Sequence, residues 1–420
     1  MSFQQGLSGL NASSKNLEVI GNNIANANTY GSKVSRAEFA SVYASSLNGA
    51  GTNLVGIGTT LQTVAQQFTQ GNVSTTDNPL DLAINGGGFF QVTDGNSQVS
   101  YTRNGQFKLN RDGYLVNNAQ DKLLGYVADS NGVIQPGRAV PLQLPTSGIE
   151  PSATTRAAME LNLDARKAVT LPASAPLIDF ANANSYNNAT SLTVYDAKGQ
   201  DIAMSFYFQK AANDSWNVYA TANGSTVAGS AAAPQPITTI NFAPDGSGPI
   251  TPSAPVAINI PSSTNAVGAV TVPITGMQFD VSAFTQFGSA YGITAQDQDG
   301  YSAGLLTKVA VEANGIVMAH YSNGESKPAG QIELASFRNP QGLQPMDDNT
   351  WASTYASGEP VVGVPGDGSL GVLQAGALEE SNIGLTGELV NMITAQRIYQ
   401  ANAQTIKTQD QVMQTLVNLR

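Results

Sequence analysis

The sequence predicts a mainly β protein with long α-helical termini and nested, discontinuous domains. Two observations support this fold class. Both ends of the 420-residue chain carry apolar residues at steps of three and four, which is typical of helices that pack along one face. Between the ends, short alternating runs are separated by turn pairs that contain glycine, which is typical of β-hairpins. We therefore expect a terminal helix pair plus two β domains.

The N-terminal helix is expected to run from about Phe3 to about Ala27, because an Asn-rich stretch and then Gly31 follow. Its apolar stripe consists of Phe3, Leu7, Leu10, Leu17 and Ile24, with Ser14 and Gly21 as small residues in the same row. A terminal helix with no core of its own must bury such a stripe elsewhere. We therefore predict that this stripe is a self-assembly seam.

The C-terminal helix is expected to run to the end of the chain. Its predicted self-assembly seam is Leu385, Leu389, Met392, Tyr399, Ile406, Met413 and Val417. Most other positions are Gln, Asn, Thr or Ala. Glu379 and Glu380 are interpreted as helix-start charges, with Ser381 as a candidate N-cap. The alternative is that both helices dock on one globular core, but two long helices of low charge at opposite ends favour packing between subunits.

The middle of the chain reads as two β domains. Predicted turn pairs occur at Asp94-Gly95, Asn104-Gly105, Asp112-Gly113, Asn131-Gly132 and Asn314-Gly315. A stretch rich in Ala, Pro, Ser and Thr separates the two hairpin regions and contains strands of its own. The expected domains are residues 1–71 with 373–420 (terminal helices with a connecting segment), 72–149 with 298–372 (discontinuous β domain) and 150–297 (inserted outer β domain).

Composition excludes several classes of function. Charged residues make up 12% of the chain and the net charge is −11, so we expect no nucleic acid and no anionic membrane surface as partner. There is no cysteine, which excludes disulfides, thiolate metal sites and cysteine nucleophiles. The N-terminus lacks a basic region followed by an apolar run, and no stretch of about 18 apolar residues occurs. We therefore expect neither a cleaved signal peptide nor membrane insertion.

Catalytic and ligand-binding motifs are weak. The one histidine, His320, is expected in a hairpin strand facing about Val309, which is a structural setting. Residues 297–300 resemble the start of a calcium loop, but Lys308 stands where the loop needs Glu. The glycines at 86–88 lack the following Lys-Ser/Thr of a phosphate loop and are expected to turn the backbone into a strand. We expect no catalytic, cofactor-binding or metal residues, no cofactor and no enzyme.

Three motifs carry a family resemblance. They are SGLNASSKNLEVIGNNIANANTYGSK at Ser8–Lys33, NPLDLAINGGGFFQV followed by YTRNGQFKLNRDGYLVN at 78–117, and ALEESNIGLTGELVNMITAQRIYQANAQTIKTQDQVMQTLVNL at 377–419. Together they resemble the bacterial flagellar axial proteins, the rod and hook family. The motifs cover both ends and flank the middle, whereas 150–297 carries little family signal.

The resemblance implies a function and partners. The large inserted β domain favours a structural subunit of the hook, with a distal rod subunit as the alternative. A hook subunit would assemble with itself into a curved, flexible, hollow tube outside the cell. The tube would transmit torque from rod to filament and provide the export channel. The implied partners are the distal rod protein, the hook cap protein, the hook–filament junction protein and the flagellar type III export apparatus. A surface β protein that binds ligand or host, or an enzyme with an unrecognised site, is the competing interpretation.

Overall fold

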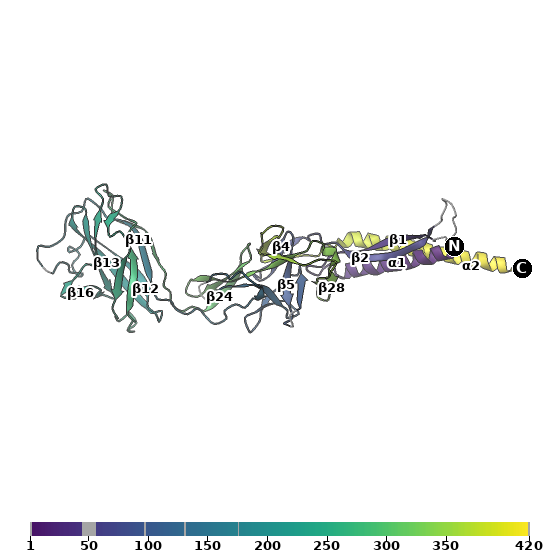
Figure 1. Cartoon of the computed structure of the whole chain (residues 1–420), viewed down its shortest axis with the longest axis horizontal. Coiled ribbons are helices and arrows are strands. Elements are labelled where there is room, and N and C mark those ends of the chain that lie inside the picture. Colours follow the sequence, from purple (N-terminus) through teal and green to yellow (C-terminus); the bar gives the residue numbers. More distant parts are fainter. Residues whose placement is uncertain (1, 44–55, 96–97, 130–131, 175, 419–420) are drawn as a thin grey trace. The chain divides into compact units, whose positions relative to one another are not determined.

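The computed structural model describes residues 2–43, 56–95, 98–129, 132–174 and 176–418. The chain forms two compact units, each described here by itself. Unit 1 comprises Met1–Thr146, Lys308–His320 and Ser326–Arg420, and unit 2 comprises Ser147–Thr307 and Tyr321–Glu325. Among the described residues the α-helices are the two terminal ones and the rest of the regular structure is β (Figure 1), which confirms the predicted fold class. The finer domain boundaries stay a prediction.

The two helices of unit 1 are α1, Ser2–Ala25, and α2, Leu385–Asn418, and they lie side by side (Figure 1). Helix α2 begins after Gly384, whose carbonyl accepts the backbone N–H of Glu388 at 3.0 Å. Ser381 is therefore not the N-cap, and that expectation was wrong. Its Oγ instead accepts the backbone N–H of Ile383 at 3.2 Å, in the turn before the helix.

A β-hairpin packs along α1, where the sequence predicted only a connecting segment. It consists of β1, Ser35–Tyr43, and β2, Gly56–Gln66, paired antiparallel. Ser8 on α1 holds β2 by two hydrogen bonds: its Oγ donates to the carbonyl of Thr59 at 2.6 Å and accepts the Thr59 N–H at 2.7 Å. The described part of the terminal region is therefore a layer of two helices and one hairpin.

The β body of unit 1 begins and ends with strands from opposite ends of the sequence. Strand β3, Val73–Thr75, pairs with β32, Ala377–Glu379, and β4, Leu82–Asn85, pairs with β31, Val372–Ala375. The remaining strands join one large sheet: β5 Phe89–Thr93, β6 Val99–Thr102, β7 Lys108–Leu109, β8 Leu115–Val116, β9 Lys122–Val127, β10 Val140–Pro141, β24 Leu306–Val311, β25 Ile316–Tyr321, β26 Ser326–Ile332, β27 Leu334–Ser336, β28 Gln344–Pro345, β29 Thr350–Ala352 and β30 Val361–Gly363. A short 3₁₀ helix spans Pro340–Gly342.

Turn chemistry explains how this body folds. Gly86 and Gly88 have φ of +121° and +115° just before β5, so these glycines turn the chain into a strand as predicted. Gly95, Gly113 and Gly315 also have positive φ, consistent with their predicted turns. Asn104-Gly105 is not a two-residue turn, because Gly105 accepts the Leu82 N–H at 3.0 Å beside strand β4. Asn131 of the predicted pair Asn131-Gly132 lies outside the described residues.

Unit 2 is a β-sandwich. One sheet has the order β20-β21-β11-β22 with β23 also on β11, and the other has the order β12-β13-β14-β18-β19 with β15 on β14. Phe206 of β13 stacks on Phe279 of β21 at 4.6 Å, so the two sheets share one core. Its strands are β11 Arg156–Asn162, β12 Asn188–Tyr195, β13 Asp201–Ala212, β14 Ser215–Ala222, β15 Ser225–Thr226, β16 Gly229–Ser230, β17 Ala233–Pro234, β18 Thr238–Phe242, β19 Pro249–Thr251, β20 Val256–Ile260, β21 Ile274–Asp280, β22 Phe284–Thr285 and β23 Gly292–Gln298.

Candidate assembly core and its junction

Small residues of α1 form its contact with α2. A Cβ added at Gly6 would lie 3.1 Å from Ile406 Cγ1, and one added at Gly9 would lie 2.8 Å from Asn402 Nδ2. Farther along, Asn23 Nδ2 donates to Glu388 Oε2 at 3.3 Å. The two helices therefore run antiparallel. Because glycine has no side chain, Ile406 and Asn402 of α2 pack directly against the α1 backbone at Gly6 and Gly9.

The α2 side of this contact follows steps of three, four and seven residues. Its less exposed residues in this row are Glu388, Met392, Ala395, Asn402, Ile406 and Gln409, with Ala403 beside Asn402. That spacing is the heptad pattern of two helices packed at a shallow angle. Polar residues occupy several of these positions, so the contact between the helices is only partly apolar.

The predicted seam residues fall into two groups. On α1, Phe3 and Leu7 are 51% and 44% exposed, while Leu10, Leu17 and Ile24 are half-buried. On α2, Met392 and Ile406 are half-buried, and the exposed residues are Leu385, Leu389, Tyr399, Met413 and Val417. The structure brings Ile406 against α1, at Gly6. The role of these residues in self-assembly is not tested by a single copy and stays a prediction.

A buried ion-pair triad lies where the terminal segments meet the β body. The Glu379 carboxylate accepts from Lys33 Nζ at 2.6 Å and from Arg103 Nη1 at 2.9 Å, and all three side chains are at most 6% exposed. It also accepts the backbone N–H of Gly71 at 2.9 Å. Glu379 is therefore not a helix-start charge, and that interpretation was wrong. We call these three residues the junction triad.

The electrostatics of the junction triad are set by burial. Burial lowers the pKa of Lys33, with Glu379 opposing the shift and Arg103 adding to it. Burial also lowers the pKa of Arg103, again opposed by Glu379. Backbone carbonyls complete the site: Lys33 Nζ donates to Thr69 at 2.9 Å and Arg103 Nη2 to Gly86 at 2.8 Å. One carboxylate thus serves two buried cations that come from different parts of the chain.

Two asparagine amides add to this junction. Asn382 accepts the Val34 N–H at 2.7 Å and donates to the Gln67 carbonyl at 2.8 Å. Asn23 on α1 accepts the Ser35 N–H at 2.9 Å and donates to the Ser35 carbonyl at 2.8 Å. Each amide thus supplies the hydrogen-bond partners of a backbone N–H and a backbone carbonyl in these segments. Periodicity could not reveal these roles, because each partner lies outside the local pattern.

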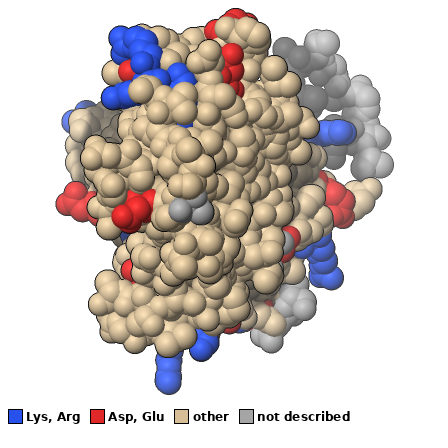
Figure 2. Space-filling model, turned by 90° about the vertical axis from the view of Figure 1, so that its left-hand side faces the viewer, with Lys and Arg blue, Asp and Glu red and all other residues tan. Residues whose placement is uncertain are grey.

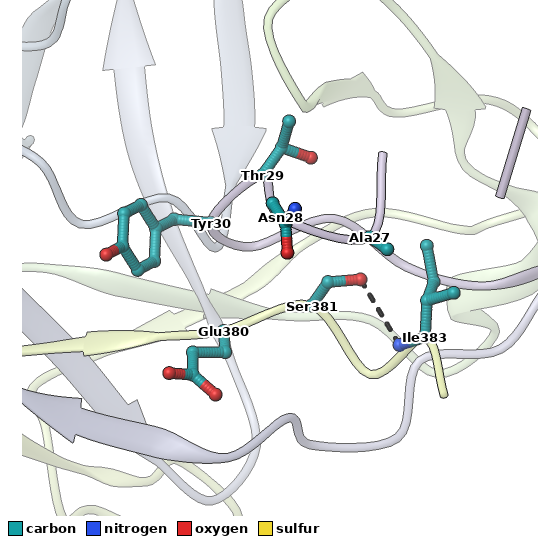
Figure 3. A pocket seen from close by; sticks show the side chains of 7 residues that line it. All are labelled: Ala27, Asn28, Thr29, Tyr30, Glu380, Ser381 and Ile383. Atoms are coloured by element: carbon teal, nitrogen blue, oxygen red, sulfur yellow. Dashed lines mark hydrogen bonds between the residues drawn. The ribbon is translucent and has the colours of Figure 1, made fainter. Parts of the chain in front are cut away.

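A polar pocket of about 330 Å³ opens beside the junction, between the loops that follow α1 and precede α2. Figure 3 shows its lining residues, which are Ala27, Asn28, Thr29, Tyr30, Glu380, Ser381 and Ile383. The lining contains one carboxylate and neither a histidine nor a lysine. In Figure 3 the Glu380 carboxylate points away from Ser381, whose Oγ accepts the Ile383 N–H, so these two side chains are not paired as base and nucleophile.

Other chemistry-bearing residues are dispersed. His320 lies half-buried on β25, and its Nδ1 is 2.7 Å from Ser326 Oγ. In the part of the chain that the structure describes, no three His, Cys, Asp or Glu residues are grouped to hold a metal ion. The helices of that same part are too short or too polar to cross a membrane.

Four family models match the chain in sequence order. They are "Flagella basal body rod protein" at residues 3–33, "Flagellar hook protein FlgE/F/G D1 domain" at 83–196, "Flagellar basal body protein FlaE D2 domain" at 162–301, and "Flagellar basal body rod FlgEFG protein C-terminal" at 374–419. The matches include both terminal helices.

Relatives that match the whole length of this chain are flagellar hook proteins. The chain is 42% identical to the flagellar hook protein FlgE of Salmonella typhimurium and 41% identical to that of Escherichia coli, with 100% of both chains covered in each case. It is 33% identical to that of Rhizobium meliloti, over 100% of this chain and 98% of the other. The crystal structure of Helicobacter pylori flagellar hook protein FlgE2 has a similar fold. Its TM-score is 0.50 at 14% identity, covering 73% of this chain and 100% of that one.

Proposed function

This chain belongs to the flagellar hook protein family, and we propose that copies of it assemble through exposed faces of their two terminal helices. It is a structural subunit of the bacterial flagellar hook, not of the distal rod. One observation carries the proposal on assembly. Large apolar side chains remain exposed on α1 and α2 although the two helices already pack on each other.

Exposed apolar side chains occur at the start of α1 and along the whole of α2. On α1 they are Phe3 and Leu7, and on α2 they are Leu385, Leu389, Val390, Ile393, Ile398, Tyr399, Val412, Met413 and Val417, each between 37% and 72% exposed. Fully burying a Leu, Ile or Phe side chain contributes about 1.5–3 kcal/mol. Concentrated apolar exposure of this kind indicates a protein contact. Neighbouring copies, which carry the same stripes, are the occupants that a homopolymer supplies.

The remaining features of the assembly follow from the same proposal. The polymer is a curved, hollow tube that transmits torque and carries exported chains along its channel. The neutral Gln, Asn and Thr side chains of α2 suit a channel wall, because they bind a passing chain neither electrostatically nor through apolar contact. Its partners are the distal rod protein, the hook cap protein, the hook–filament junction protein and the flagellar type III export apparatus. We infer no catalytic role.

The charge distribution supports protein partners rather than nucleic acid. The net charge is −11, and Figure 2 shows a mostly uncharged face with one small group of Lys and Arg at its upper left and no basic patch that extends across it. A nucleic-acid surface requires clustered cations that neutralise phosphates. We therefore propose no nucleic-acid partner.

Charge substitutions on the exposed stripes test the proposal. Leu7→Asp and Leu389→Asp are expected to abolish tube formation, because a buried unpaired carboxylate costs several kcal/mol. Both should leave the unfolding of units 1 and 2 unchanged, since the two side chains are exposed in the single copy. The measurement is negative-stain electron microscopy of concentrated, salted-out protein, with pelleting to quantify polymer.

Gln404→Asp is the matched control, because Gln404 is also exposed on α2 and its neighbours one turn away, Gln400, Ala401, Lys407 and Thr408, include no large apolar residue. It is expected to polymerise normally. Normal tubes from Leu7→Asp and Leu389→Asp would show that these stripes are not assembly contacts.

A further inference from the structure

Among the described residues of unit 1, one aromatic side chain lies wholly in solvent. Tyr355 is fully exposed (104%) in the loop between β29 and β30. An exposed tyrosine indicates a binding residue only when the loop that carries it is held in one conformation.

Side-chain hydrogen bonds hold that loop in one conformation. Ser357 is buried, and its Oγ donates to the Thr354 carbonyl at 2.8 Å and accepts the Thr354 N–H at 2.9 Å. Thr354 Oγ1 donates to the Gly342 carbonyl at 2.6 Å, and Asn339 Nδ2 donates to the Ala356 carbonyl at 3.0 Å. Tyr355 is therefore carried on a pre-organised turn and loses little loop entropy when it binds.

The same unit also has an open pocket of about 490 Å³ with a buried carboxylate in its wall. We call it the Glu333 pocket. Its apolar lining consists of Val99, Leu124, Val140, Pro141 and Val362, and its polar lining includes Gln91, Thr93, Arg138 and Glu333. Pockets of this volume accommodate an aromatic side chain with room to spare.

Glu333 is only 3% exposed, yet neutral groups are its hydrogen-bond donors. Its carboxylate accepts from Gln91 Nε2 at 2.7 Å and from Tyr126 OH at 2.6 Å. Within the described ranges, no Lys or Arg lies within ion-pair distance of it. A carboxylate has about four acceptor positions, so two remain for further donors. A buried carboxylate gains stability from each added donor.

We propose that Tyr355 of one copy inserts into the Glu333 pocket of a neighbouring copy. The ring packs on Val140 and Val362, and the hydroxyl donates to the Glu333 carboxylate. Tyrosine suits this pocket because it combines an apolar body with a polar tip, and it is enriched at protein interfaces for that reason. The inference rests on the proposed assembly of this chain.

The proposed occupant is a second copy, because the Tyr355 turn and the Glu333 pocket are two different patches of the same chain. A contact between two different patches of the same chain is heterologous, and when its rotation does not close it repeats into an open helical polymer. A contact of one patch with itself would close a dimer instead. Tyr355 is not among the residues that line the Glu333 pocket of its own chain, so the exposed tyrosine and the carboxylate complement each other between copies.

The absence of cysteine allows a direct test. An Ala356→Cys, Ala139→Cys variant, which keeps Tyr355 and Val140 and places the thiols beside them, would be polymerised, checked for tubes by electron microscopy, and treated with a short bismaleimide crosslinker. We expect a ladder of covalent oligomers on a denaturing gel. Each single variant should remain monomeric on the gel. The control pair Val133→Cys, Ala139→Cys should also give no ladder, because Val133 is exposed (58%) but lies outside the turn that carries Tyr355.

Substitutions of Tyr355 provide a second measurement that needs no crosslink. Tyr355→Ala is expected to raise the concentration at which polymer forms by about tenfold, the size of a typical anchor residue, and Tyr355→Phe by a smaller factor. Tubes without a ladder, or polymerisation of Tyr355→Ala at the wild-type concentration, would overturn the inference and leave the assembly proposal intact. Failure of the unmodified chain to form any tube would instead refute the assembly proposal.

Discussion

At the residue scale, the junction triad shows how one carboxylate can organise distant segments. Lys33 follows α1, Arg103 follows β6, and Glu379 ends the strand before α2. Removing one partner from a buried pair leaves a charge without compensation, which is more costly than the pair itself is stabilising. The triad therefore makes docking of both terminal segments onto the β body interdependent.

Glu379→Gln tests the junction triad. The substitution leaves Lys33 and Arg103 buried without an anion, and we expect unit 1 to lose about 3–5 kcal/mol of unfolding free energy. Urea unfolding followed by the fluorescence of Trp351 measures it. Glu380→Gln is the control, because Glu380 is only half-buried and its carboxylate accepts just from Asn72 at 3.2 Å. Equal midpoints for the two variants would contradict the assigned role.

Tyr126 links stability to alkaline pH. Burial, together with the hydrogen bond and charge of Glu333, raises the pKa of Tyr126 to about 12, compared with about 10 in the unfolded chain. A group whose pKa is raised by folding contributes stability that is fully present below pH 10 and is lost as the pH rises from about 10 to about 12.

Tyr126→Phe is therefore expected to be less stable than the wild type at neutral pH, by about 1–3 kcal/mol, because Glu333 loses a donor. The difference should shrink between pH 10 and pH 12. Other buried tyrosines titrate in both proteins, so the comparison of the two unfolding curves isolates Tyr126. A difference that stays constant over this range would show that the Tyr126 hydroxyl is not coupled to folding.

At the scale of elements, α1 packs on α2 through some of its glycines and not through others. Gly6 and Gly9 face α2, while a Cβ at Gly21 would meet nothing within 4 Å. Gly9 and Gly21 of the same helix thus have different surroundings. At Gly9 the Asn402 side chain occupies the space that a Cβ would need, whereas at Gly21 the single copy leaves open space.

Gly9→Leu is expected to push the helices apart and to destabilise their pairing by about 1–3 kcal/mol, the usual cost of overpacking. Gly21→Leu should not weaken the pair and should favour the helix, because glycine is about 1 kcal/mol worse than alanine in a helix interior. Thermal loss of the helical circular dichroism signal, with limited proteolysis of the ends, compares the two. Identical melting of both variants would argue against the close contact at Gly9.

At the scale of the whole molecule, each unit has its own core and its own tryptophan. The chain contains two tryptophans; Trp216 is buried in the core of unit 2, and Trp351 is buried in unit 1, where its Nε1 donates to Gln66 at 2.6 Å. The two chain segments at the start and end of unit 2 also pair with each other, because isolated β-bridges join residue 149 to 304 and residue 152 to 301. These features are those of independently folding domains.

We therefore expect two separate unfolding transitions. In Trp216→Phe the fluorescence reports unit 1, and in Trp351→Phe it reports unit 2. Adding Glu379→Gln should shift the transition in the first background and leave it unchanged in the second. A shift of both transitions by the same amount would show that the units unfold together.

The sequence by itself determined the fold class, the helical ends and the family. Each of these depends on local information: the three- and four-residue steps of the helices, the glycines that turn the chain at Gly86 and Gly113, and the contiguous motifs at both ends. Local periodicity also located apolar stripes on both helices. It did not reveal the β1–β2 hairpin, because the described residues of these strands are exposed or half-buried and show no clear alternation of buried and exposed positions.

Only the tertiary structure decided which faces meet. Periodicity gives a helix its apolar face, but the contact with α2 uses the small residues Gly6 and Gly9 beside that face. Likewise Glu379 resembles any acidic residue before a helix until the fold brings it to Lys33, 346 positions away in sequence. The physical reason is the same in both cases. Burial and pairing are properties of the neighbours that a side chain meets, and chain folding selects those neighbours across distances that no local pattern records.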